Sequence, residues 1–134
     1  MANKSAVDTN VLIYLHDNSN KNKREIAIDT LADKPLIASQ VVSEYLNVTR
    51  RILSLSKDEL LEQTAKLFSE CIIIPISPGT LHYASKLIKQ YKFQLFDAVI
   101  IAAAIEAQCD MLYSEDMHHK LLVDNKLTII NPFI

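Results

Sequence analysis

The stretch FDAVIIAAAIEAQCDMLYSED, residues 96–116, decides how this chain is expected to fold. After the acid Asp97, eight uninterrupted apolar residues run from Ala98 to Ile105. A helix that is apolar on every face is a buried helix, and the alanine-rich composition favours helix over strand. Met111–Tyr113 then predicts a short strand. The pattern therefore predicts a central buried helix that begins at Asp97, and a strand that ends shortly before Asp116.

The composition is that of a globular protein with one domain, residues 1–134. Hydrophobic residues make up 49% and charged residues 22%, which excludes a disordered chain and allows a buried core. The formal net charge of −2 gives no overall positive field, so a polyanion has to be bound by local cationic patches. The single glycine, Gly79, excludes the glycine-rich phosphate loops of nucleotide-binding folds.

The sequence predicts a cytoplasmic location without a membrane segment. Its longest apolar run is far shorter than the ~20 residues that span a bilayer. The first residues, MANKSAVD, lack the apolar segment of a signal peptide. Cys71 and Cys109 are isolated in apolar surroundings, without the spacing of a metal site. We therefore expect both to be small buried side chains in a reducing compartment.

Short apolar segments alternate with helical patterns along the rest of the chain. Strands are predicted at residues 4–7, 36–38, 72–74, 111–113 and 127–130, and further helices at 11–17, 23–33, 40–53, 57–69 and 78–92. Leu81 is expected on the inward face of the helix 78–92, and Ile52 on the core face of the helix 40–53. This alternation predicts an α/β fold: a three-layer α/β/α sandwich with a mainly parallel central sheet of four to five strands.

Four acids are predicted to meet at one edge of this sheet, because functional groups gather at the carboxyl ends of parallel strands. Asp8 ends the first strand, Asp116 follows the strand at 111–113, Asp97 opens a helix, and Glu44 lies one turn into another. Two carboxylates ~5 Å apart repel by about 3 kcal/mol at an effective dielectric near 20. A hard divalent cation, Mg²⁺ or Mn²⁺, removes that repulsion. The set is typical of metal-assisted phosphodiester hydrolysis.

Each acid also has a simpler interpretation. Asp8 is a candidate helix cap or Asx turn, Asp97 a charge favoured by the helix dipole, and Asp116 a turn residue. Glu44 shares a flank of its helix with Val41 and Arg51, away from the predicted core face, and is a candidate for a solvated side chain paired with Arg51.

Two groups of basic residues are candidates for RNA phosphate contacts. On the helix that ends near residue 92, His82, Lys86 and Lys89 form one stripe, with Lys92 near its end. Because this helix runs directly into the segment of Asp97, the stripe is a possible phosphate site beside the acids. Arg50 and Arg51, on the helix of Glu44, form the second group. The simpler interpretation is a solvated helix face for the lysines and a structural salt bridge for the arginines.

Four segments, in this order and spacing, resemble the PIN-domain ribonucleases that act as VapC-like toxins of bacterial and archaeal toxin–antitoxin modules. The segments are DTNVLI (8–13), SQVVSEYL (39–46), FDAVIIAAA (96–104) and LYSEDM (112–117). The resemblance covers the whole chain, including the ending INPF (130–133). The chain departs from the family pattern at Gln108 and at His118–His119–Lys120, where relatives often have glycine.

The resemblance implies an endoribonuclease that depends on Mg²⁺ or Mn²⁺. Its acidic set is Asp8, Glu44, Asp97 and Asp116, of which Asp8, Asp97 and Asp116 bind the metal. Asn10 and Ser114 match positions that support the acids or the scissile phosphate. The family also implies a homodimer, silenced by a small cognate antitoxin protein.

Two other functions fit part of the sequence. A phosphatase with an aspartyl nucleophile also places an aspartate, here Asp8, at the end of its first strand. Such enzymes use a second aspartate two positions later as the general acid, and the residue here is Asn10. The other alternative is a catalytically silent relative that binds RNA or a protein, which the intact acidic set disfavours.

Overall fold

The computed structural model of the protein describes residues 4–134. Its strands are β1 (Ser5–Val7), β2 (Ile37–Ala38), β3 (Ile73–Ile74), β4 (Met111–Tyr113), β5 (Leu122–Val123) and β6 (Leu127–Ile130). Its α-helices are α1 (Thr9–Ile13), α2 (Lys21–Ala32), α3 (Ser39–Ile52), α4 (Lys57–Leu67), α5 (Pro78–Tyr91) and α6 (Leu95–Glu106), and a 3₁₀ turn, η1 (Tyr14–His16), follows α1.

The central sheet is mainly parallel, as the sequence predicts. Its strand order is β1-β4-β6-β5, in which β1, β4 and β6 are parallel and only β5 runs antiparallel to its neighbour. The parallel pair β2–β3 continues the sheet through a bridge between Leu36 and Ala6 of β1. Val7 pairs with Tyr113, so β1 and β4 end side by side, and the next residues, Asp8 and Ser114, meet at the same edge.

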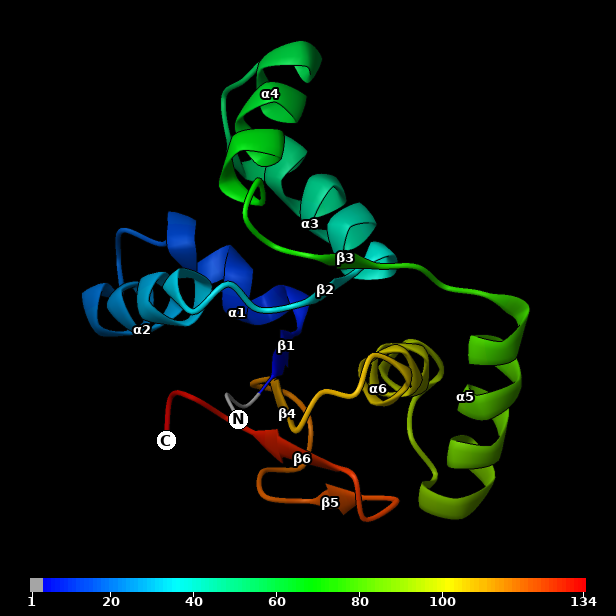
Figure 1. Cartoon of the computed structure of the whole chain (residues 1–134). Helices are drawn as coiled ribbons and strands as arrows, with labels where there is room; N and C mark the ends of the chain where they lie inside the picture. The colour runs from blue at the N-terminus through cyan, green and yellow to red at the C-terminus, as the bar shows by residue number, and fades with distance from the viewer. Residues whose placement is uncertain (1–3) are drawn as a thin grey trace.

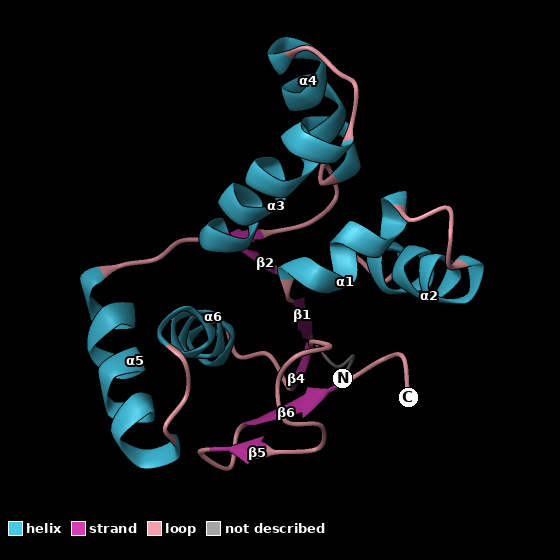
Figure 2. Ribbon diagram, turned by 180° about the vertical axis from the view of Figure 1, so that it is seen from behind, coloured by secondary structure: helices cyan, strands magenta, loops and turns pink. Residues whose placement is uncertain are grey.

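The helix α6 is buried, which confirms the prediction from residues 96–116. Its residues Ala98–Ile105 are all buried, and Ala98, Ile101 and Ala102 have no exposed surface. Figure 1 shows α6 between α5 and the sheet, with α1 and α2 on the opposite side; the same layers are seen from behind in Figure 2. The molecule is thus an α/β/α sandwich, and a hairpin of α3 and α4 extends from one end of it.

The strand β5 was not among the sequence expectations. It is only two residues long, and it pairs with β6 through a tight turn in which Lys126 N donates to Val123 O (2.9 Å). Asp124 and Asn125, at the centre of this turn, both have a φ of 54°. Positive φ at both central residues is the requirement of a type I′ hairpin turn, and Asp and Asn adopt it more readily than other non-glycine residues.

Four details of the helical predictions are wrong. Leu81 and Ile52 are each 54% exposed, although both were expected to face inward. Val41 has no exposed surface, although it was assigned to a flank away from the core. The hairpin of α3 and α4 explains the exposure of Ile52 and the burial of Val41. The body of the molecule buries the start of α3, whereas the end of α3 projects with α4 (Figure 1). The helix predicted at 11–17 is instead divided into α1 and η1.

At two of the positions where relatives often have glycine, this chain has another residue in the left-handed conformation. Gln108 has a φ of 63° and Lys120 a φ of 68°. After α6, Gln108 N donates to Ile105 O (2.9 Å) and Cys109 N to Ala104 O (3.0 Å), the pair of hydrogen bonds of a Schellman motif. A left-handed non-glycine residue costs about 1 kcal/mol. Gln108 lies between the end of α6 and β4, and Lys120 lies between β4 and β5.

The two cysteines differ in exposure: Cys109 is buried as expected, whereas Cys71 is only half-buried. No helix within residues 4–134 has the length and apolar character needed to cross a bilayer.

Candidate active site

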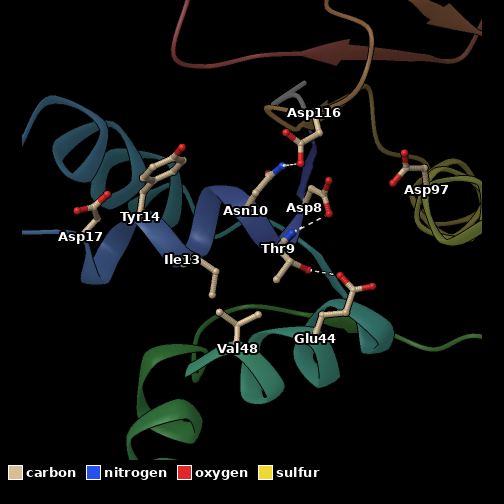
Figure 3. Close-up of a pocket in the computed structure, with 10 residues that line it drawn as sticks. All are labelled: Asp8, Thr9, Asn10, Ile13, Tyr14, Asp17, Glu44, Val48, Asp97 and Asp116. Atoms are coloured by element: carbon tan, nitrogen blue, oxygen red, sulfur yellow. Dashed lines mark hydrogen bonds between the residues drawn. The ribbon is translucent and has the colours of Figure 1, made fainter. Parts of the chain in front are cut away.

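A cavity of about 430 Å³ lies beyond the carboxyl ends of β1 and β4. It is bounded by α1, the start of α3, the first turn of α6 and the loop after β4 (Figure 3). Its lining residues are Asp8, Thr9, Asn10, Ile13, Tyr14, Asp17, Glu44, Val48, Asp97 and Asp116. The four acids singled out in the sequence, which are spread over more than a hundred residues, therefore line one cavity.

Asp8 is the most buried of the four acids and is both a helix cap and part of the cavity wall. Its Oδ1 accepts from the backbone N–H of Thr9 (2.7 Å), which caps α1, and its Oδ2 accepts from Ser114 Oγ (2.8 Å). Burial raises the pKa of Asp8 from its ordinary 3.8 to about 6. The two hydrogen bonds oppose this shift, and the charges of Asp97 and Glu44 add to it.

Asp116 lies on the loop after β4 and is joined to α1 by Asn10. The side-chain amide of Asn10 donates to Asp116 Oδ2 (2.8 Å), and its Oδ1 accepts from the backbone N–H of Glu115 (3.4 Å). Asn10 and Ser114 thus hold two different acids in place, Asp116 and Asp8 respectively.

Glu44 points into the cavity from α3 and is held by two neutral donors. Thr9 Oγ1 donates to Glu44 Oε2 (2.7 Å), and Gln40 Nε2, one turn earlier on α3, donates to Oε1 (2.9 Å). In the described part of the chain Glu44 forms no salt bridge with Arg51. The interpretation of Glu44 as a solvated surface residue paired with Arg51 is therefore wrong.

Asp97 faces the other acids from the first turn of α6. It is half-buried, and burial, followed by the charges of Asp116 and Glu44, raises its pKa. The pKa shifts of Asp8 and Asp97 have the same causes: burial first, and then the charges of the neighbouring acids.

The predicted basic residues lie outside this cavity. Lys86 and Lys89 are exposed on α5, which packs on the far side of α6 from the sheet, and Lys92 ends that helix. Arg50 lines a separate groove between α3 and α4, where its Nε donates to Asn47 Oδ1 (3.1 Å). No lysine or arginine in residues 4–134 is among the side chains that line the acidic cavity. Contacts of these residues with RNA stay a prediction.

The cavity has hard oxygen donors, the ligand type that Mg²⁺ and Mn²⁺ prefer. In the described part of the chain, however, no three His, Cys, Asp or Glu side chains lie close enough to hold an ion between them. Mg²⁺ keeps several waters and needs only one or two carboxylates as direct ligands, so it does not require such a group of three. The donor set therefore fits a partly hydrated divalent cation.

Sequence reasoning missed several residues of the cavity. Thr9 and Gln40 both donate hydrogen bonds to Glu44. Only the contact with Gln40 could be predicted from the sequence, because Gln40 and Glu44 are spaced i, i+4 on a helix. Ile13 and Val48, from α1 and α3, point toward each other in Figure 3 and form an apolar part of the wall. Their apolar character alone does not identify a cavity wall, because partial burial beside a cavity gives the same hydrophobic pattern as a core face.

Solved structures with the same fold are toxins and their complexes. A toxin–antitoxin complex from Klebsiella pneumoniae is 23% identical, with a TM-score of 0.72 over 96% of this chain and 98% of the other. VapC20 of Mycobacterium tuberculosis, a toxin that cleaves the sarcin–ricin loop, is 16% identical, with a TM-score of 0.66 over 84% and 90%. VapBC2 of Rickettsia felis, bound to a fragment of its promoter DNA, is 18% identical, with a TM-score of 0.66 over 95% and 98%.

No curated protein matches the sequence. At identities below 25%, the likeness to solved structures establishes the fold. The family is established separately by the sequence, because residues 6–122 match the model of the PIN domain. Because this match covers most of the chain, the protein belongs to the PIN-domain family.

Proposed function

We propose that this protein is a metal-dependent endoribonuclease and the toxin of a toxin–antitoxin pair. The observation that carries the proposal is the cavity where Asp8, Glu44, Asp97 and Asp116 meet with no basic side chain in its lining, within the described residues. Burial, and after it the charges of the neighbouring acids, raises the pKa values of Asp8 and Asp97, so a bound cation would favour their charged forms. The likeness to toxins, one of which cleaves the sarcin–ricin loop, supports RNA as the substrate.

Asp8, Asp97 and Asp116 are the residues that would hold Mg²⁺ or Mn²⁺, directly or through water molecules bound to the ion. When bound, the ion lowers the pKa of a water molecule and neutralises charge on the phosphate oxygens. Asn10 and Ser114 keep Asp116 and Asp8 in position through their hydrogen bonds.

Glu44 completes the set by orienting the attacking water and accepting its proton. Both carboxylate oxygens of Glu44 are already fixed by Thr9 and Gln40, so the group is presented to the cavity in one orientation. In-line attack on phosphorus forms a bond to the water oxygen and breaks the P–O3′ bond. The products are then a 5′-phosphate and a 3′-hydroxyl, which is the outcome of the family's chemistry.

The proposed partners follow from the structural relatives, which include a toxin–antitoxin complex from Klebsiella pneumoniae and VapBC2 of Rickettsia felis. We infer that a small cognate antitoxin silences this protein, that the toxin forms a homodimer, and that it acts in the cytoplasm on cellular RNA. Co-expression with the product of a neighbouring short reading frame is expected to give a stable complex that does not cleave RNA.

Metal removal tests the proposed activity. Purified protein is expected to cleave total RNA or transfer RNA in Mg²⁺ or Mn²⁺, to lose that activity in EDTA, and to regain it when excess Mn²⁺ is added. Gel analysis with 5′-end mapping of the fragments provides the measurement. Undiminished cleavage in EDTA contradicts the proposal, and RNA binding without cleavage in either metal indicates a silent binding module. Hydrolysis of a phosphomonoester with a trapped aspartyl-phosphate indicates the phosphatase.

Thr9 provides a test of the role of Glu44. Changing Thr9→Val keeps the shape of the side chain but removes the hydrogen bond to Glu44, so we expect cleavage to slow about tenfold. Thr9→Ser retains a hydroxyl and is expected to retain most activity. The matched control is Thr30→Val on α2, another buried threonine, whose hydroxyl bonds only its own helix at Ile26 O. Equal rates for Thr9→Val and the wild type would refute the assigned role.

A further inference from the structure

The three residues after β4 each send their side chain to a different part of the molecule. Ser114 is buried and donates to Asp8, and Asp116 lines the cavity and accepts from Asn10, so both are bonded to cavity residues. Glu115, between them, is not part of the cavity lining and instead contacts α2 and the start of η1. This middle residue has no role in the activity proposed above.

Both carboxylate oxygens of Glu115 are occupied. Tyr14 Oη donates to Oε1 (2.6 Å), and Lys23 Nζ, on α2, lies 2.5 Å from Oε2. Lys23 also donates to Tyr14 Oη (3.2 Å), which closes a ring of three hydrogen bonds. Although burial alone raises the pKa of Glu115, the hydrogen bonds from Lys23 and Tyr14 outweigh it and lower that pKa, so the carboxyl group stays ionised.

Aromatic packing shields this ring of hydrogen bonds from water. Phe133, in the C-terminal tail, meets the Tyr14 ring edge-on with centroids 4.9 Å apart. The Lys23 ammonium lies 4.8 Å from the Tyr14 centroid and 5.3 Å from that of Phe133, within the range of cation–π attraction. The side chains of Lys23 and Glu115 are 30% and 22% exposed, so this ion pair is more protected than a typical surface pair.

The backbone of Glu115 is fixed as well. Its N–H donates to Asn10 Oδ1, and its carbonyl accepts from Asn131 Nδ2, both at 3.4 Å. The next residue, Asp116, is by contrast exposed, and within the described residues its carboxylate has one hydrogen bond, from Asn10. The position of Asp116 therefore depends on how firmly its neighbour is held.

We propose that Tyr14, Lys23 and Glu115 form a positioning clamp for Asp116, and that this clamp sets the affinity of the site for its divalent cation. The inference rests on the proposed function, in which Asp116 is one of three metal-binding acids. Side chains that orient a metal ligand typically change metal affinity by 10- to 100-fold when they are removed. Lys23 and Glu115 lie outside the cavity lining, and Tyr14 borders it. The clamp acts on the site through the Glu115 backbone and Asp116, so its three members are positioning residues.

Two substitutions weaken the clamp while they preserve its packing. Tyr14→Phe keeps the ring against Phe133 and removes only the hydroxyl, and Glu115→Gln removes the charge that Lys23 neutralises. Tyr83→Phe is the matched control, because the Tyr83 hydroxyl also donates to a loop carboxylate, Asp124, and lies on α5 outside the lining of the cavity. Tyr14→Phe and Tyr83→Phe each lose a tyrosine–carboxylate hydrogen bond, and Glu115→Gln loses the charge of the carboxylate. All three variants can therefore lose stability, and a loss of stability alone does not test the clamp.

The experiment measures Mn²⁺ binding by calorimetry and by the loss of the free-ion EPR signal, alongside cleavage as a function of Mn²⁺ concentration. Tyr14→Phe and Glu115→Gln are expected to bind Mn²⁺ about tenfold more weakly. Their cleavage at saturating Mn²⁺ is expected to approach that of the wild type. Tyr83→Phe is expected to leave both quantities unchanged, even where its melting temperature falls.

The outcomes separate this inference from the proposed function. If the wild type binds Mn²⁺ and cleaves RNA, but Tyr14→Phe retains full affinity, the clamp is refuted and the nuclease is not. A wild type that neither binds Mn²⁺ nor cleaves RNA overturns the proposed function and the clamp with it. Should Glu115→Gln fail to fold, Tyr14→Phe alone decides, because it removes a single hydroxyl.

Discussion

Changing Asp97→Asn is expected to reduce RNA cleavage about a thousandfold while the protein remains folded. The asparagine amide has nearly the shape of the carboxylate but lacks its charge, and Asp97 faces Asp8, Glu44 and Asp116 across the cavity. Burial and the neighbouring charges raise the pKa of Asp97, so removing its charge relieves repulsion in the metal-free protein. The loss of activity is therefore attributable to the site rather than to unfolding.

Asp58→Asn is the matched control for this substitution. Asp58 lies in the first turn of α4, as Asp97 does in α6, but it is exposed and outside the cavity lining. Both variants lose the same favourable interaction with a helix dipole. Initial rates on one RNA substrate, measured at equal protein concentration, provide the comparison. Cleavage by Asp97→Asn at the rate of Asp58→Asn contradicts the assignment of Asp97 to the site.

Asp8→Asn is expected to abolish cleavage and, in EDTA at pH 7.5, to stabilise the fold by up to about 3 kcal/mol. The pKa of Asp8 is about 6 in the folded protein, against an ordinary value of 3.8. Each pKa unit corresponds to 1.36 kcal/mol, so the roughly two-unit shift measures the cost of keeping this buried carboxylate charged.

The sign of the effect follows from proton linkage. Between about pH 4 and pH 6 the folded state holds a proton on Asp8 that the unfolded state has lost, so the wild type loses stability as the pH rises through this window. Below it, both states are protonated and the penalty vanishes. The advantage of Asp8→Asn is thus full above pH 6 and disappears near pH 4.

Urea unfolding at several pH values, with EDTA present, measures this difference in the free energy of unfolding. Asparagine at position 8 keeps an oxygen to accept from the Thr9 N–H, so the cap of α1 survives. Added Mg²⁺ is expected to stabilise the wild type more than the variant, because only the wild type has the charge that the ion compensates. A variant that is less stable than the wild type at pH 7.5, or a difference independent of pH, contradicts this description of Asp8.

The strongest local signals in the sequence predicted the fold correctly. Ala98–Ile105 is apolar on every face, and no exposed helix is compatible with that pattern, so α6 and the strand after it were predictable. The alternation of strands and helices likewise predicted the parallel sheet and the two helical layers. These features depend on burial, which the hydrophobic pattern reports directly.

Features decided by tertiary context were not predictable. The strand β5 is two residues long and exists because its type I′ turn presents it to β6. Val41 and Ile52 share one helix, yet one has no exposed surface and the other is 54% exposed, because α3 leaves the body of the molecule along its length. The hydrophobic periodicity of a helix does not show where along its length the elements packed against it end.

Asp8, Asp97 and Asp116 could be singled out because each lies near a strand end or a helix start, whereas Glu44, one turn into α3, had the weakest signal. The hydrogen bonds that hold these acids in place were harder to predict, because they join residues far apart in the sequence. Thr9 and Glu44 are 35 residues apart, and Lys23 and Glu115 of the clamp are 92 residues apart. The lysine stripe on α5 has regular spacing, but α6 separates that helix from the sheet. Spacing along a helix predicts which residues share a face, not which site that face adjoins.

The central claim is that Asp8, Asp97 and Asp116 hold a divalent cation in one cavity. Anomalous scattering from crystals grown with Mn²⁺ tests it most directly, because the anomalous signal locates the ion without assumptions about activity. We predict a peak inside the cavity, in contact with oxygen atoms of these acids or of water between them. A protein that cleaves RNA in Mn²⁺, yet whose crystals place the ion elsewhere or show none in this cavity, would contradict the claim.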